Sequence, residues 1–192
     1  SFWGWVLKGF ALLFVASMIL LQIPELRYDA GKREPVVLSN SRELRAENIE
    51  ESVYAVLEGK ANFEHAFVYQ RYGLNYSYFN IDPYGMDIIA RTYDTIDASW
   101  LEMESFEGKL RPFDDQPFSY RIEEILFELH GESVPEGACF LAIGDVPEVS
   151  GWQVGAVVVA ALILAAMSYL FFVFLPKRKK WLSDGAAGSL ET

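Results

Sequence analysis

The stretch GWQVGAVVVAALILAAMSYLFFVFL, which runs from Gly151 to Leu175, has 25 residues and no charged side chain. At a rise of about 1.5 Å per residue, a helix of this length exceeds the hydrocarbon thickness of a bilayer, which is about 30 Å. Buried core helices of soluble proteins seldom run past about 14 apolar residues, and they do not need the four consecutive cations that follow Pro176. The stretch therefore predicts a transmembrane helix over 151–175.

The first 23 residues contain a second apolar run, in which Lys8 is the only charge. The run is long enough to span a bilayer, because the aliphatic stem of Lys8 can carry its ammonium group back to the near interface. A cleaved secretory signal is the alternative, since residues 9–21 have the length of a signal core. Trp3 and Trp5 are typical of an interfacial aromatic belt, so we expect a retained transmembrane helix over 1–23.

Cations flank both predicted spans and act as topology anchors. They are Lys8, Lys177, Arg178, Lys179 and Lys180. The positive-inside rule places both chain termini in the cytoplasm, so residues 24–150 are expected outside it, in the periplasm if the cell is bacterial. Tyr28 and Trp152 then fall near the opposite interface. Residues 176–192 are expected to form a basic and then mobile cytoplasmic tail.

Between the spans, residues 24–150 are numerous enough for one compact domain. They carry 25 Asp and Glu against 11 Lys and Arg, a net charge of −14. Such a surface repels nucleic acid, so a partner selected by charge should be cationic or bear a metal. We expect the lipid bilayer and other membrane-protein subunits, or a second copy of the chain, as partners. The simpler alternative is that acidity keeps the domain soluble.

Two segments of this domain carry helix signals. Residues 40–59 begin at Asn40, a possible N-cap with Glu43 three residues on, and end at Gly59. Residues 119–131 place apolar side chains on one face between Ser119, a possible cap, and Gly131. We expect a helix in each.

Other segments favour strands. Residues 65–81 are rich in aromatics with Gly73 between two runs, which predicts a hairpin, and residues 34–39 and 138–145 are expected to be short strands. In residues 83–106, apolar spacings of three and four favour an amphipathic helix, which we expect, whereas the β-branched content favours strands. The sequence therefore predicts a membrane protein in which two transmembrane α-helices flank one α+β extracytoplasmic domain, with a mainly helical domain as the alternative.

The sequence carries none of the common catalytic motifs: it has no phosphate-binding glycine loop, no serine-hydrolase elbow and no paired cysteines. The two histidines, His65 and His130, lack a ligand spacing, so a metal site built from them, Cys139 and carboxylates rests on residue type alone. Cys139 lies in an apolar run and is expected to be a buried small hydrophobe. We therefore predict no catalytic residue, no cofactor, no metal site and no enzyme activity.

A stiff acidic loop, RPFDDQPF, is a candidate for recognition within the domain, because two carboxylates lie between two pairs of proline and aromatic residues. The possible recognition loop consists of Arg111, Phe113, Asp114, Asp115 and Phe118. The ordinary alternative is a loop that leads into a helix and places an acidic residue near its positive end.

The second span carries small residues on one broad side. They are Gly151, Gly155, Ala161, Ala165 and Ser168. In lipid, such a side lets another helix approach closely, and the partner helix is the first span, a second copy or another protein.

These features favour a non-catalytic accessory, structural or assembly subunit of an integral membrane protein complex, because anchoring both ends of a domain raises its effective concentration at the membrane face. One alternative is an extracytoplasmic sensor that holds a ligand in an aromatic cluster. That cluster comprises Tyr69, Tyr72, Tyr76, Tyr78 and Phe79. Further alternatives are a homo-oligomeric assembly factor and, less favoured, a membrane-tethered enzyme.

Overall fold

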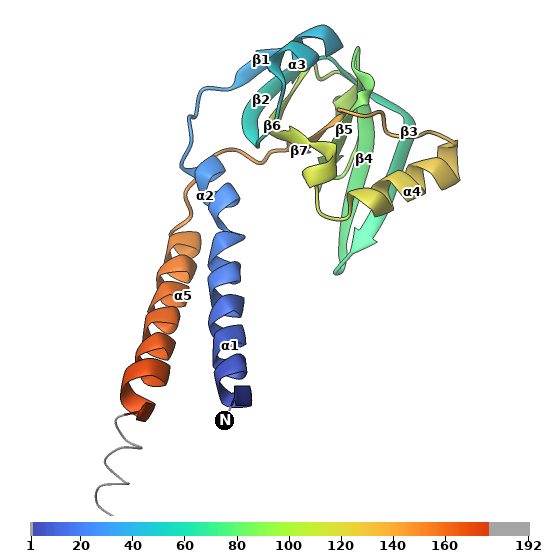
Figure 1. Ribbon diagram of the computed structural model, residues 1–192. Coiled ribbons are helices and arrows are strands. Elements are labelled where there is room, and N and C mark those ends of the chain that lie inside the picture. The colour runs from blue at the N-terminus through green and yellow to red at the C-terminus, as the bar shows by residue number, and fades with distance from the viewer. Residues whose placement is uncertain (1, 177–192) are drawn as a thin grey trace, which may run out of the picture. The chain divides into compact units, whose positions relative to one another are not determined.

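The computed structural model describes residues 2–176 (Figure 1). Its helices are α1 (Phe2–Leu20), α2 (Ile23–Asp29), α3 (Ser41–Glu47), α4 (Ser119–His130) and α5 (Gly151–Tyr169), with short turns η1 (Ala98–Leu101), η2 (Phe113–Asp115) and η3 (Leu170–Phe174). Its strands are β1 (Val36–Leu38), β2 (Val53–Glu58), β3 (Lys60–Arg71), β4 (Leu74–Asp82), β5 (Gly85–Thr92), β6 (Ser105–Pro112) and β7 (Cys139–Ile143). The chain forms two units: one contains α1 and α5, and the other is Tyr28–Glu148.

The first unit is a pair of apolar helices. Trp3–Asp29 and Gly151–Phe174 are long and apolar enough to cross a membrane by length and composition. The rings of Trp5 and Phe172 lie 5.8 Å apart, and the Nζ atom of Lys8 donates to the carbonyl oxygen of Phe171 at 3.4 Å. The N-terminal end of α1 therefore lies beside the C-terminal end of the second helix, so the two helices are antiparallel.

The second unit is built on one seven-stranded sheet with the order β1-β2-β6-β7-β5-β4-β3. The pairs β1–β2 and β5–β7 are parallel and the other neighbours are antiparallel. Helix α4 lies across one side of this mixed sheet (Figure 1). The α+β prediction for the domain agrees with this architecture, and the mainly helical alternative is wrong.

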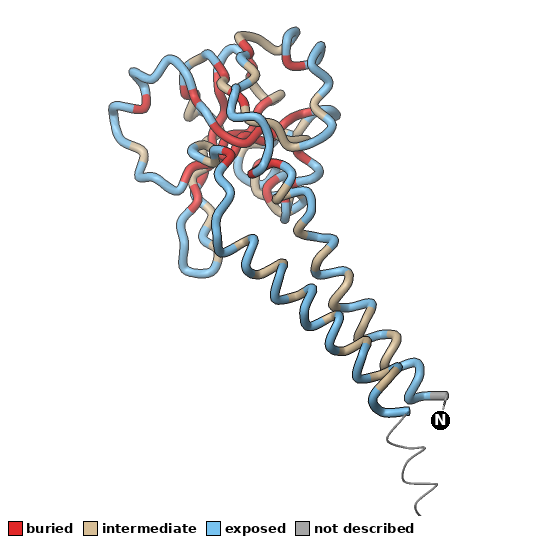
Figure 2. Tube along the Cα trace, turned by 90° about the vertical axis from the view of Figure 1, so that its left-hand side faces the viewer, coloured by how far each residue is buried: buried red, intermediate tan, exposed pale blue. Residues whose placement is uncertain are grey.

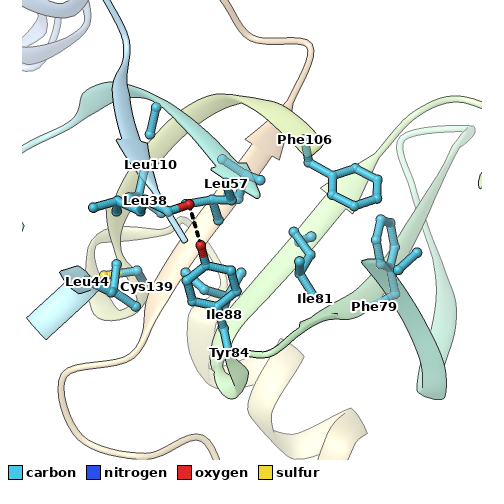
Figure 3. Close-up of a cluster of buried hydrophobic side chains, with 14 of the residues drawn as sticks. Leu38, Leu44, Leu57, Phe79, Ile81, Tyr84, Ile88, Phe106, Leu110 and Cys139 are labelled. Carbon is cyan, nitrogen blue, oxygen red and sulfur yellow. Dashed lines mark hydrogen bonds between the residues drawn. The ribbon is translucent and has the colours of Figure 1, made fainter. Parts of the chain in front are cut away.

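Each face of the sheet buries its own core, because successive side chains of a strand point to opposite faces. We call the face covered by α3 and η1 the apolar face; its core includes Leu57, Phe79, Ile81, Ile88, Phe106 and Leu110 (Figure 3). The opposite face, which we call the α4 face, includes Phe67, Tyr76, Tyr78, Ile89, Ile122, Leu126 and Phe140. Burial is concentrated in the sheet, whereas residues 3–20 of α1 and all residues of α5 are intermediate or exposed (Figure 2).

Local signals predicted several elements correctly. The expected hairpin is β3 and β4, joined by Tyr72 and Gly73, which both have positive φ angles of 51° and 78°. Such two-residue turns suit the twist of a hairpin, and glycine adopts the second position without strain. The expected strands at 34–39 and 138–145 are β1 and β7, and the expected helix at 119–131 is α4, which ends at Gly131. Phe118, and not Ser119, occupies its N-cap position.

Two helix predictions were wrong in whole or in part. Residues 83–106 form β5, η1 and β6 instead of a helix, because their β-branched side chains fit a sheet whose two faces are both covered. The helix predicted over 40–59 covers only Ser41–Glu47. Asn40 caps it as expected, accepting from the backbone N–H groups of Arg42 and Glu43, but Asn48 adopts a left-handed conformation that ends it before the valine-rich β2.

Candidate functional site

The predicted recognition loop divides into a buried part and an exposed part. Phe113 is buried in the core of the α4 face, and the guanidinium of Arg111 lies 5.9 Å from the ring centre of Phe140. Asp114, Asp115 and Phe118 are exposed. Phe113 therefore cannot meet a partner without unfolding the loop, whereas Asp114, Asp115 and Phe118 can.

Helix α4 continues this exposed part into a larger surface. Tyr120 and Phe127, which are 70% and 62% exposed, lie seven residues apart and hence on one side of the helix. Ile122 and Leu126, on the opposite side, hold α4 to the sheet. Three exposed carboxylates, those of Glu123, Glu124 and Glu128, lie on the same broad side of α4 as the two rings. Asp114 and Glu123 line a common cavity of about 290 Å³. We call the whole set the α4 outer surface; it comprises Asp114, Asp115, Phe118, Tyr120, Glu123, Glu124, Phe127 and Glu128.

Beneath α4, the sheet carries cations that sequence reasoning missed. The strand register places Tyr78, Arg91, Ala142 and Lys109 in one row across β4, β5, β7 and β6. Arg91 and Lys109 are only 7% and 3% exposed, although the domain is strongly acidic. The guanidinium of Arg91 lies 5.0 to 5.4 Å from the ring centres of Tyr76, Tyr93 and Phe140. Alternation along a strand could have revealed this row only if residues 83–106 had been assigned as strands.

The aromatic rings on this face stabilise the buried cations through their negative π faces. The guanidinium of Arg71, at the end of β3, lies 4.4 Å from the ring centre of Phe118 and 5.5 Å from that of Tyr76. Because Arg91 also lies beside the Tyr76 ring, these contacts link the row of cations to the α4 outer surface. Burial raises the pKa of the Tyr78 hydroxyl, while Arg91 and Arg71 lower it. The neutral hydroxyl is therefore the favoured form of this buried phenol.

Lys109 also joins the two places where the chain enters and leaves the domain. Its Nζ atom lies 3.1 Å from the Asp145 carboxylate and 4.2 Å from the ring centre of Tyr28. The Tyr28 hydroxyl donates to the carbonyl oxygen of Asp145 at 2.5 Å. We call these three residues the clasp. Tyr28, which we expected near a membrane interface, is buried at the start of the domain, and its position relative to a bilayer stays a prediction.

The five aromatic residues considered as a ligand pocket lie on both faces of the sheet and at the hairpin turn. Phe79 packs in the core of the apolar face, Tyr76 and Tyr78 pack in that of the α4 face, and Tyr72 is exposed at the hairpin turn. A cavity of about 380 Å³ includes Tyr78 together with Phe67, Asn75, Tyr93 and Ile96. The five aromatics therefore do not line one common site.

Cys139 is buried in the core of the apolar face, as expected. Burial, and to a lesser degree Asp87, raises the pKa of its thiol to about 11. The reactive thiolate is therefore scarce at neutral pH.

The small-residue side of the second span lies away from α1. Residues of α5 that are partly covered in the helix pair include Ala156, Ala160, Leu164 and Ser168. Gly151, Gly155, Ala161 and Ala165 are exposed, and a Cβ atom added at either glycine would touch no atom within 4 Å. Of the predicted packing residues, only Ser168 is partly covered. Among the predicted anchors, Lys8 lies in the described chain, whereas Lys177, Arg178, Lys179 and Lys180 lie outside the described residues.

Comparison with protein-family models, with curated proteins and with solved structures finds no match for this chain.

Proposed function

We propose that the protein is a non-catalytic accessory subunit of an integral membrane protein complex. Its two apolar helices anchor it in the bilayer, and its domain, outside the cytoplasm, offers the α4 outer surface to a partner subunit. The observation that supports this most directly is the exposure of Tyr120 and Phe127 on a side of α4 that also carries exposed carboxylates. Aromatic rings surrounded by polar groups are typical of the anchor residues of protein interfaces.

Charge complementarity defines the partner. Glu123, Glu128 and the two aspartates of η2 give the α4 outer surface a negative charge, in a domain whose net charge is already −14. Glu124 is paired with Arg121 of the same helix. A partner segment that is rich in Lys and Arg and carries apolar side chains would neutralise this surface and cover its rings. We therefore assign the surface to a basic, amphipathic segment of another subunit.

The helix pair supports membrane docking. Lys8 and the cations of residues 177–180 favour cytoplasmic termini, and the antiparallel pairing of α1 and α5 is compatible with both termini on one side. Because α1 covers the other side of α5, Gly151, Gly155 and Ala161 are left for a helix of the complex, which can approach closely where side chains are small.

Site-directed photocrosslinking in native membranes tests the proposal. A photoreactive amino acid replaces Tyr120 or Phe127, and a matched control replaces Val37, an exposed residue of β1 on another part of the domain. We expect one discrete crosslinked partner from both α4 positions, none from Val37, and loss of the crosslink when Glu123 and Glu124 are both changed to Lys. The partner should also co-purify stoichiometrically in mild detergent.

The other outcomes discriminate among the alternatives. Crosslinks only to a second copy would replace the subunit function with that of a homo-oligomeric assembly factor. Equal crosslinking from Val37 and the α4 positions, or none at all, would show that the α4 outer surface binds no subunit.

A further inference from the structure

A cavity of about 400 Å³ lies at the carboxyl ends of two neighbouring strands, β5 and β7. The two strands are parallel, so both end at the same edge of the sheet. Residues 91–94 line the cavity from the end of β5, and residues 143–145 line it from the end of β7. Crevices beyond the carboxyl ends of parallel strands bind ligands in open α/β sheets, and small-molecule sites usually measure about 300 to 1,000 Å³.

One residue of the cavity wall is a buried cation. Arg91 is 7% exposed, and its Nε atom has no hydrogen-bond partner within residues 2–176. No carboxylate in this part of the chain lies within 4.0 Å of its guanidinium. The ring centre of Tyr93, which also lines the cavity, lies 5.0 Å from the guanidinium carbon. A buried cation without an anionic partner is unfavourable, and the planar fork of an arginine matches a carboxylate.

The same wall carries a carboxylate that is not paired. Asp94 is exposed and lines the cavity, and its side chain makes no hydrogen bond or ion pair with the other described residues. Its backbone N–H donates to the Oγ1 atom of Thr92 at 3.0 Å, which holds the turn that follows β5. By contrast, Asp145 on the other side of the cavity is already paired with the buried Lys109 at 3.1 Å. The cavity therefore presents one cation and one carboxylate whose charges no ion pair balances.

We propose that this cavity binds a small zwitterion of the α-amino acid class, with its carboxylate on Arg91 and its ammonium group on Asp94. A molecule with both charges complements this wall, whereas Asp94 repels an inorganic anion and Arg91 repels a simple amine. The side chain of the ligand lies against Tyr93 and Ile143, which favours an apolar or aromatic amino acid. The inference does not rest on the proposed function, because no residue of the α4 outer surface lines the cavity.

Equilibrium dialysis of the full chain in detergent against a mixture of the standard L-amino acids tests the site, with mass spectrometry to identify what is retained. We expect the wild type to retain one or more apolar or aromatic amino acids. Arg91→Met should weaken the affinity by at least about tenfold, because it removes charge-assisted hydrogen bonds to the carboxylate. Asp94→Asn should weaken it less, because Asp94 is exposed. Arg71→Met is the matched control: Arg71 also lies beside the Tyr76 ring but does not line the cavity, so this variant should bind as the wild type does.

Derivatives of the retained amino acid provide a second readout, which an effect on folding would not reproduce. The amide lacks the carboxylate charge, so the wild type and Arg91→Met should bind it equally weakly. The N-acetyl derivative lacks the ammonium charge, so the wild type and Asp94→Asn should bind it equally weakly. If the wild type retained no amino acid, or if Arg91→Met retained as much as the wild type, the proposal would be overturned. Undiminished binding of the N-acetyl derivative would also overturn it, because the cavity would then bind a simple carboxylate.

Discussion

The two faces of the domain's sheet are built from alternate residues of the same strands, yet they bury different chemistry. The apolar face packs aliphatic and aromatic side chains, among them Leu57, Ile88 and Phe106, around the buried hydroxyl of Tyr84. The α4 face buries Arg91 and Lys109 among aromatic rings. Burying a charge is unfavourable unless it is compensated, so the α4 face is not the arrangement that stability alone would favour. Both faces stabilise the domain through their apolar cores, and the α4 face in addition buries cations that support the clasp.

The most destabilising substitution that we predict lies in the core of the apolar face. Phe106 is fully buried and packs against Phe79 and Trp100. Phe106→Ala should lower the free energy of unfolding by about 3 to 5 kcal/mol, because it removes a ring from a close-packed core and leaves a cavity. Chemical unfolding in detergent, followed by circular dichroism, measures the change. Leu101→Ala, at an exposed position of η1, is the control and should change stability by less than about 0.5 kcal/mol.

A smaller loss is expected from the clasp on the α4 face. Lys109→Met keeps the length of the side chain but removes its contacts with Asp145 and the Tyr28 ring. Hydrogen bonds to charged groups contribute about 1.5 to 3 kcal/mol, and the partial exposure of Asp145 reduces this to about 1 to 2 kcal/mol. Amide hydrogen exchange should accelerate near residues 28 and 145. Lys60→Met, which removes an exposed cation from β3, should leave both measurements unchanged.

If Lys109→Met left stability and exchange as in the wild type, the clasp would not hold the two chain segments together. The structural role assigned to the clasp would then be wrong.

The core of the apolar face contains one buried side-chain hydroxyl that makes a hydrogen bond, that of Tyr84. It donates to the carbonyl oxygen of Leu38 at 2.6 Å (Figure 3). Tyr84→Phe should lower stability by about 1 kcal/mol at pH 7, the usual contribution of one hydrogen bond. Burial, followed by Glu43 and Glu58, raises the pKa of Tyr84 from 10.0 to about 12. The folded protein therefore favours the protonated phenol, and this stabilisation is complete below pH 10 and is lost as the pH rises toward 12.

The measurement compares unfolding free energies of the wild type and Tyr84→Phe at pH 8 and pH 11. We expect the wild type to lose more stability over this interval than the variant, because only the wild type carries the Tyr84 proton. An equal loss in both proteins would contradict the raised pKa.

The sequence predicted those parts of the domain whose signals are local. The β3–β4 hairpin was identified from Gly73 between two aromatic runs, and α4 from the spacing of its buried Ile122 and Leu126 and from Gly131. Residues 83–106 were misassigned because β5 buries consecutive residues, Ile88 to Thr92, on both faces of the sheet. A strand covered on both faces shows no alternation, and its apolar residues then also match the spacing of a helix.

The candidate sites could not be predicted in the same way, because they join residues far apart in the chain. Tyr28 meets Asp145 across the whole domain, and Arg91 and Asp145 line one cavity only because β5 and β7 pair in parallel. Of the predicted recognition loop, the fold turned Phe113 inward and left Asp114 and Asp115 outside. Residue type identified these side chains as candidates, but the order of the strands determined which of them are neighbours.

The substitution that should change the unfolding free energy least is at Arg91, one of the two buried cations of the α4 face. Among the described residues, no carboxylate lies within 4.0 Å of the buried guanidinium of Arg91, and three aromatic rings surround it. Methionine keeps contact with these rings and removes the cost of burying a charge, so Arg91→Met should change the unfolding free energy by less than about 1 kcal/mol. Chemical unfolding in detergent, as for Phe106→Ala, measures the change in unfolding free energy. A loss as large as that of Phe106→Ala would mean that the contacts of the Arg91 guanidinium with these rings stabilise the domain as much as a core phenylalanine does.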